Sequence, residues 1–175
     1  MNAVKRLINL LTLVLLGCTS SHWAWAKSSD RDQPIQIRAD AGMVNESTGV
    51  SIYTGNVTID QGTMHIRADE VEVIMSDREV VQIIARATEP DSPLAHYEHV
   101  PDDATEPVTA DAKRITYLVQ EERLHLAGTA RLKQVRDTFS GELLYYDVNK
   151  GIVDLKSDRK AGDRIKMTIN PRNNP

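Results

Sequence analysis

Strict alternation of apolar and polar residues is the feature that most limits how this chain can fold. Between Tyr53 and Val73 the sequence reads YTGNVTIDQGTMHIRADEVEV, in which Met64, Ile66 and Ala68 fall on one side of an extended chain. The same alternation returns over residues 164–170, and no window after residue 26 holds a sustained helical spacing of apolar residues. The pattern predicts half-buried β-strands, with one face toward a core and the other toward water.

Turn residues separate these predicted strands at short intervals. Glycine occurs between apolar runs at five places, namely residues 54–56, 61–62, 127–129, 140–141 and 149–151. Short strands between such turns favour a sandwich, a barrel or a β-roll. Four prolines interrupt residues 88–107, so this segment is expected to be a connection with at most one short strand, near residues 94–97.

The sequence also repeats itself. The letters IRAD occur at residues 37–40 and again at residues 66–69, and the whole chain divides into two similar halves. Three correspondences relate the halves: residues 37–40 with 108–111, Gly55 with Gly128, and residues 65–73 with 138–146. A single hairpin cannot bury its apolar face, so stacked copies are expected to supply one another's core. Aromatic residues make up 5% of the chain, which predicts a core of Val, Ile, Leu and Met.

Residues 1–26 have the pattern of a secretory signal peptide. Lys5 and Arg6 precede a short apolar run, and Ala24-Trp25-Ala26 is typical of a cleavage site, which places the cut after Ala26. An alternative is lipidation of Cys18, which follows Leu15-Leu16-Gly17. The domain prediction is a signal peptide over 1–26, a β-domain over 27–170 and a disordered polar tail over 171–175.

Loss of the signal peptide makes the chain more acidic. It removes two basic residues and no acid, so 21 basic residues become 19 against 25 acidic ones, and the net charge goes from −4 to −6. A basic face is the usual footprint of nucleic-acid binding, so no nucleic-acid partner is expected. If Ala26 is the cut, the only cysteine leaves, and the exported chain has no disulfide.

Several of these segments together resemble a known family. The stretches DQPIQIRAD (32–40), YTGNVTIDQGTMHIRADEVEV (53–73), ITYLV (115–119) and LAGTARL (126–132) are similar to the OstA-type domain of the LptA family. The resemblance covers residues 32–160 and implies an all-β fold, a twisted and open β-jellyroll with an apolar interior and little or no helix. It implies a periplasmic protein that binds lipopolysaccharide through lipid A and needs no cofactor.

The resemblance also implies partners. Copies would join head to tail, the last strand of one pairing with the first strand of the next, and LptC-like inner-membrane and LptD-like outer-membrane proteins would complete a bridge. The edge strands would carry Ile35, Ile37 and Ala39 at one end and Ile165, Met167 and Ile169 at the other. Matching the family's lipid-contacting positions places Ile35, Ile37, His96, Tyr117 and Val119 on a groove, although His96 departs from the aromatic residue expected there.

Other chemistries fit the sequence less well. His96 and His99 with Glu98 offer too few ligands for a defined metal site, so no metal is expected. Asp69 and Glu70 are adjacent in a predicted strand and would face opposite ways, whereas a glycosidase needs two carboxylates facing each other across a cleft. No nucleophile or phosphate-binding motif is present, and no catalytic residue is predicted. An envelope glycan hydrolase and a ligand-free β-roll scaffold are the alternative functions.

Overall fold

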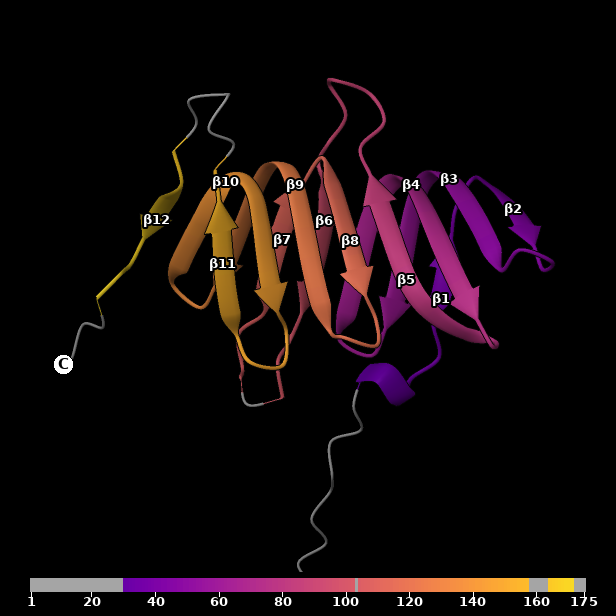
Figure 1. Cartoon of the computed structure of the whole chain (residues 1–175), viewed down its shortest axis with the longest axis horizontal. Coiled ribbons are helices and arrows are strands. Elements are labelled where there is room, and N and C mark those ends of the chain that lie inside the picture. Colours follow the sequence, from indigo (N-terminus) through magenta and orange to yellow (C-terminus); the bar gives the residue numbers. More distant parts are fainter. Residues whose placement is uncertain (1–29, 103, 158–163, 172–175) are drawn as a thin grey trace, which may run out of the picture.

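The computed structural model describes residues 30–102, 104–157 and 164–171, and these residues form an all-β protein with one short 3-10 helix, η1, as predicted (Figure 1). The predicted signal peptide, its cut at Ala26, Cys18 and residues 172–175 lie outside the described residues. The elements are η1 (Asp30–Asp32), β1 (Gln36–Arg38), β2 (Ala41–Asn45), β3 (Val50–Gln61), β4 (Met64–Ser76), β5 (Glu79–Arg86), β6 (Ala95–His99), β7 (Val108–Ala112), β8 (Arg114–Leu118), β9 (Arg123–Gln134), β10 (Asp137–Asp147), β11 (Ile152–Lys156) and β12 (Lys166–Thr168).

The strands form a roll of two antiparallel layers that share four long strands. Layer A has the order β2-β3-β4-β5-β8-β9-β10-β11, and layer B has the order β1-β3-β4-β6-β7-β9-β10-β12. The long strands β3, β4, β9 and β10 arch over the top of the view in Figure 1, so that each contributes one half to each layer. The short strands divide between the layers. The single strand expected between the prolines is β6.

Glycine allows the long strands to bend from one layer to the other. Gly55 has a φ of 80° and is followed by Asn56 at 47°, and the register between β3 and β4 shifts at this point. A Cβ on Gly55 would lie 2.5 Å from Oδ2 of Asp40, so a larger residue would be strained and would also clash. Gly128 makes the equivalent bend in β9, with a φ of 79°.

The internal repeat is real, and strand pairing defines its alignment. The amide of Asp40 donates to the carbonyl of Gly55, and the amide of Lys113 donates to that of Gly128, so both pairs of counterparts are 73 positions apart. The predicted match of residues 65–73 with 138–146 has this offset and is confirmed. The predicted match of Asp40 with Asp111 is wrong by two positions, because Asp40 corresponds to Lys113. Both alignments keep the same face inward, so alternation alone could not separate them.

The core lies between the layers, along the whole roll. In layer B one row of directly opposed residues runs from end to end: Ile37, Ile59, Ile66, Tyr97, Ala110, Leu132, Phe139 and Met167. Next to the bend the interior residues are small, and Ala95, Ala112 and Ala130 are fully buried, which leaves room for the layers to converge. The core is aliphatic as predicted, with the addition of buried tyrosines such as Tyr97 and Tyr146.

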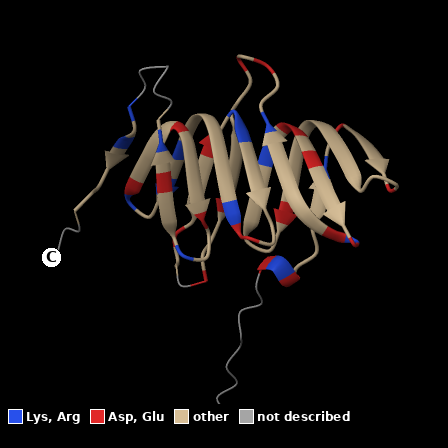
Figure 2. Cartoon of the chain, viewed as in Figure 1, with Lys and Arg blue, Asp and Glu red and all other residues tan. Residues whose placement is uncertain are grey.

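Charged residues of both signs are interspersed over the outer surface. Figure 2 shows acidic and basic residues mixed along the strands, with no long run of basic residues on any strand in this view. In the part of the chain that the structure describes, no helix combines the length and the apolar character that a membrane crossing requires.

Candidate functional site

The long side of the roll opposite the bend, which we call the open side, carries a line of cavities. One of about 490 Å³ contacts Ile35, Val80 and Val119. The next, of about 300 Å³, shares Gln61 with it and contacts Tyr97 and Tyr117. A third, of about 230 Å³, contacts Val108 and Tyr146 and adjoins the second at Val148. These neighbouring cavities lie along the open side and together are called the open-side groove. Its lining combines aliphatic and aromatic residues with charged ones such as Asp30, Arg31 and Glu122.

Aromatic rings from both layers line the floor of this groove. The Tyr97 ring on β6 lies 5.9 Å from that of Tyr117 on β8 and 5.4 Å from that of His99, between ring centroids. His99 lies 6.3 Å from Tyr146 on β10. Burial raises the pKa of Tyr117 and of Tyr146 to about 12, and burial also raises the pKa of Tyr97 well above its usual value, so all three phenols stay neutral. The three tyrosines therefore contribute uncharged aromatic rings to the floor.

The η1 segment lies across the open side and contacts both layers. The Asp30 carboxylate accepts hydrogen bonds from the amide and hydroxyl of Thr63, at the β3–β4 turn. The Arg31 guanidinium is 3.0 Å from the carboxylate of Glu122, at the β8–β9 turn. The buried amide of Gln61 donates to the carbonyls of Arg31 and Gln33. η1 thus ties the rims of the two layers together over the middle of the groove.

Four of the five predicted groove residues face the interior or the groove. Ile35 and Val119 line the first cavity, Tyr117 lines the second, and Ile37 packs against the core from β1. His96 differs from the prediction. It lies on the outer face of layer B, where its Nδ1 is 2.8 Å from the carboxylate of Asp111, because residues along a strand point alternately to opposite faces.

The groove residues that the sequence reasoning missed are Tyr97, His99 and Tyr146. Tyr97 and His99 belong to the alternating run Ala95, Tyr97, His99, all of which are buried. This alternation was a usable signal, but the match to the family placed the neighbouring His96 inward instead. A shift of one position in a strand reverses the face, so an alignment error of one residue was sufficient to cause this.

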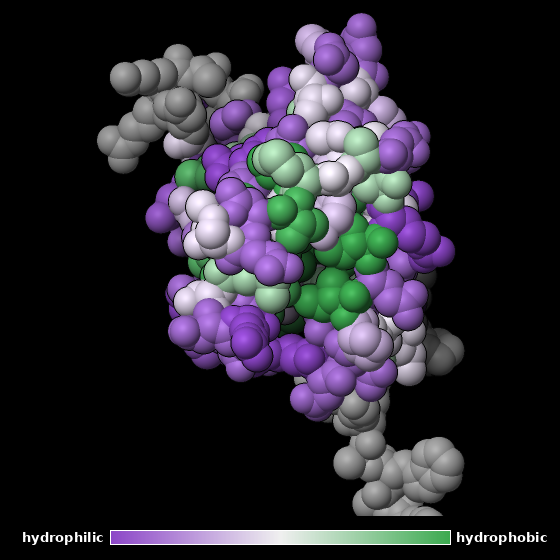
Figure 3. Space-filling model, turned by 90° about the vertical axis from the view of Figure 1, so that its right-hand side faces the viewer, coloured by the Kyte–Doolittle hydropathy of each residue, from purple (hydrophilic) through white to green (hydrophobic). Residues whose placement is uncertain are grey.

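Both ends of the roll expose apolar edge strands. At the N-terminal end Met43 and Val44 of β2 are exposed, and Figure 3 shows hydrophobic side chains gathered around a hollow there. At the other end Ile165, Met167 and Ile169 are about half exposed or more. Of the predicted edge residues, only Ile37 and Met167 fall within β1 and β12, and Ile35, Ala39, Ile165 and Ile169 flank those strands.

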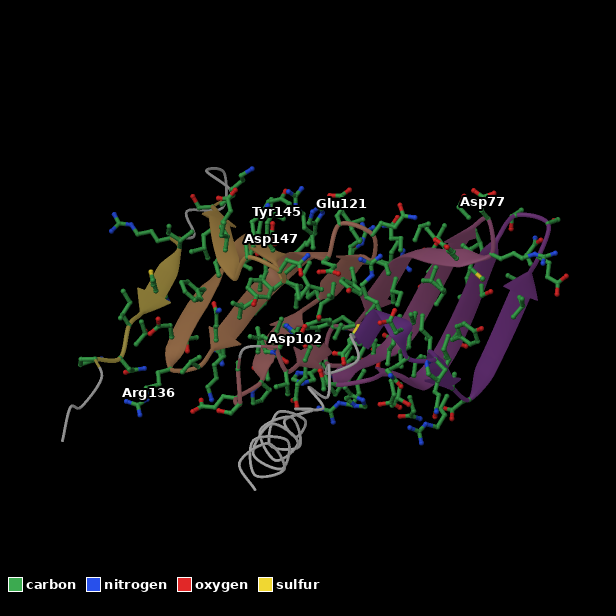
Figure 4. The ribbon with its side chains drawn as sticks, turned by 90° about the horizontal axis from the view of Figure 1, so that it is seen from below. Asp77, Asp102, Glu121, Arg136, Tyr145 and Asp147 are labelled. Carbon is green, nitrogen blue, oxygen red and sulfur yellow. The ribbon has the colours of Figure 1, made fainter. Side chains whose placement is uncertain are left out.

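Polar contacts also occur on the outer surfaces, away from the groove. Viewed from below in Figure 4, side chains fill the space between the layers, whereas Glu121 and Tyr145 lie along one outer side. Tyr145 packs edge-on against His125 there, and His65 is held by the carboxylate of Asp60. In the described ranges no group of three or more His, Cys, Asp and Glu side chains is placed to hold a metal ion.

Comparisons with known proteins find relatives of matching length. Residues 36–152 match the family described as LptA/(LptD N-terminal domain) LPS transport protein. The lipopolysaccharide export system protein LptH of Pseudomonas aeruginosa is 30% identical over 176 residues, covering 95% of this chain and 97% of the relative. The lipopolysaccharide export system protein LptA of Escherichia coli K12 is 30% identical over 152 residues, covering 85% and 77%.

A solved structure shows the same fold. The crystal structure of LptH, titled the LptA homologous periplasmic component of the conserved lipopolysaccharide transport device from Pseudomonas aeruginosa, matches with a TM-score of 0.73 at 28% identity. The match covers 82% of this chain and all of that one.

Proposed function

Because this chain belongs to the family of LptA and LptD N-terminal domain lipopolysaccharide transport proteins, we propose that it carries lipopolysaccharide through the periplasm. The lipid A acyl chains lie against the apolar floor of the open-side groove, and the polar headgroup stays at the rim. The observation that carries this proposal is the groove itself, which is lined by Tyr97 from layer B and by Tyr117 and Val119 from layer A. It lies between two ends of the roll that both expose apolar residues.

Apolar burial must dominate the affinity. Both the lipid headgroup and the exported chain, at a net charge of −6, are acidic, so long-range electrostatics do not favour the complex. Each buried CH₂ contributes about 0.8 kcal/mol, so a dozen buried carbons give an upper bound of about 10 kcal/mol. A continuous groove lets each step of movement exchange one apolar contact for another, which keeps the barrier to advance low.

The edge strands support assembly. β1 and β2 each pair only with β3, and β11 and β12 each pair only with β10, among the residues that the structure describes. Their outer edges have backbone groups available for another chain. The two ends differ, so contact between unlike ends extends into a filament rather than closing into a dimer. Such a filament, completed by LptC-like and LptD-like proteins at the two membranes, would carry the groove from one membrane to the other.

Native mass spectrometry of the protein isolated from its own cell envelope tests lipid binding. We expect bound lipopolysaccharide on the wild type, loss of that mass in Val119→Asp, and its retention in His125→Asp, where the new charge lies on the outer face. Circular dichroism checks that both variants are folded. Absence of bound lipid in every wild-type preparation would favour a ligand-free scaffold. The named role of the relatives is transport, which favours a carrier over a glycan hydrolase.

A further inference from the structure

We propose that the junction between the two halves of this chain is the template for the junction between successive copies, and that it defines the pairing residue by residue. This inference rests on the head-to-tail assembly proposed above. It adds which strands pair, in which layer, and in which register.

The junction within the chain consists of two antiparallel pairs, one in each layer. In layer A, β5 pairs with β8, and Ile83 lies opposite Tyr117. In layer B, β6 pairs with β7, and Tyr97 lies opposite Ala110. The first half therefore ends on β5 and β6, and the second half begins with β7 and β8.

Each of these strands has a counterpart at an end of the molecule. β7 and β8 both pair with β9, in the same way that β1 and β2 both pair with β3. Equivalent residues in these two sets of strands are 73 positions apart in the sequence, as Ile37 and Ala110 are. β11 and β12 both pair with β10, in the same way that β5 and β6 both pair with β4. Equivalent residues in these strands are 70 positions apart, as Tyr97 and Met167 are. The C-terminal end of the roll is thus built like the end of the first half, and the N-terminal end like the start of the second.

Replacing each residue of the internal junction by its counterpart gives the register between copies. In layer B, Met167 lies opposite Ile37 of the next copy, because Tyr97 lies opposite Ala110. In layer A, Val153 lies opposite Val44, because Ile83 lies opposite Tyr117. The remaining interior pairs are Ile165 with Ala39, Ile169 with Ile35, and Leu155 with Gly42.

The side chains agree with this register. Met167 is 52% exposed and Val44 is 61% exposed in the single chain, and both are in rows that face the interior. The register brings every interior pair together as apolar against apolar, and the core row of layer B continues from Met167 into Ile37 of the next copy. A slip of one residue would instead place Met167 opposite Gln36 or Arg38 and turn one apolar face outward.

The outer face contains one like-charged pair, Lys166 opposite Arg38. At the equivalent position the internal junction has an attractive pair, because His96 lies opposite Asp111 with its Nδ1 2.8 Å from that carboxylate. A like-charged pair does occur elsewhere in the internal junction, where Arg86 lies opposite Arg114. There, the guanidinium of Arg86 is 3.0 Å from the carboxylate of Glu70 and 2.7 Å from that of Glu72. Arg38 is likewise 2.6 Å from the carboxylate of Asp60. An acidic partner on the neighbouring strand offsets the repulsion in both places.

Disulfide mapping tests the register. A full-length chain carrying Cys18→Ser has no other cysteine, so Met167→Cys in one preparation and Ile37→Cys in another leave one thiol on each. Directly opposed Cα atoms lie about 4.5–5.5 Å apart, within the disulfide range of about 4.4–6.8 Å. Residues two positions away lie diagonally, at about 7–8 Å. The matched controls are therefore Met167→Cys mixed with Ile35→Cys and with Ala39→Cys.

The mixture of Met167→Cys with Ile37→Cys should give a reducible heterodimer as its main oxidised product, and the two control mixtures should not. The pair Val153→Cys with Val44→Cys should behave in the same way for layer A. A stronger product from either control mixture would overturn the register. Light scattering of the wild-type chain separates the two proposals: assembly without the 37–167 disulfide overturns this register alone, and no assembly at any concentration overturns head-to-tail assembly itself.

Discussion

Tyr97 of β6 and Tyr117 of β8 meet across the interior of the roll, with ring centroids 5.9 Å apart and ring planes inclined by 52°. They come from different layers, so this contact joins layer B to layer A beside the open-side groove. Tyr97 is 1% exposed and belongs to the core, whereas Tyr117 lines the cavity more openly at 6%. The same cluster therefore contributes to stability and forms the surface on which a lipid would rest.

Truncation of Tyr97 should be costly. Tyr97→Ala removes a fully buried ring, and loss of such a ring with the cavity left behind typically costs about 3–5 kcal/mol. Urea unfolding followed by circular dichroism measures this change in the unfolding free energy. His96→Ala is the matched control on the other face of the same strand, and it should cost far less. Similar costs for the two variants would contradict the assignment of faces in β6.

The bend of β3 should not tolerate a side chain. Gly55→Ala places a Cβ at a φ of 80° and 2.5 Å from Oδ2 of Asp40, so it should destabilise the chain by more than about 1 kcal/mol. Gly141→Ala is the control, because the nearest atom that its Cβ would meet is Cγ2 of Ile165, at 3.5 Å. Thermal unfolding should show a clear loss for the first variant only. Equal midpoints would show that the bend is not strained by a side chain.

Two of the polar contacts of η1 should differ in strength. Asp30 accepts hydrogen bonds from the amide and hydroxyl of half-buried Thr63, so Asp30→Ala should cost about 1.5–3 kcal/mol. The Arg31–Glu122 ion pair is half exposed on the arginine side, and such pairs contribute about 0–1 kcal/mol, so Glu122→Gln should have little effect. Hydrogen exchange of the Thr63 amide and chemical unfolding provide the two measurements. A larger loss from Glu122→Gln would reverse this ranking.

Acid should weaken the fold partly through Asp69. The backbone amide of Thr88 donates to this carboxylate and holds its pKa below the ordinary value of 3.8. Because the pKa is lower in the folded state, the contribution is fully present above pH 3.8 and is lost as pH falls through the folded value. The unfolding free energy should therefore decline less steeply below pH 3.8 in Asp69→Asn than in the wild type. An unchanged slope in urea titrations at pH 2–5 would rule out this contribution.

Much of the fold followed from alternation and turn residues. The period-two runs over residues 53–73 and 164–170 located β3, β4 and β12, and the correspondence of Gly55 with Gly128 indicated two similar halves. The low helix content follows from the absence of helical spacing. These features are local, and a half-buried strand needs only its own alternation to be recognised.

The arrangement of the strands in space could not be predicted in the same way. Nothing local shows that β3 turns from one layer to the other at Gly55, because a glycine turn is equally typical of a hairpin. Two predictions were wrong for a related reason: His96 was expected to face the groove, and Asp40 was matched with Asp111 rather than with Lys113. Strand periodicity gives alternate faces but not absolute register, and only the pairing with β4, β7 and β9 settles both.

The central claim is that lipopolysaccharide lies against the interior aromatic floor and not on the outer surface. Photocrosslinking in living cells tests it most directly, with a photoreactive phenylalanine at Tyr97 in one strain and at His96 in another. Tyr97 and His96 are neighbours on β6 that face opposite sides of layer B. The expression and folding of the two variants can therefore be compared at adjacent positions of the same strand. The account predicts lipopolysaccharide adducts from position 97 and none from position 96. Adducts from position 96 alone, or from neither position while the protein remains functional, would contradict it.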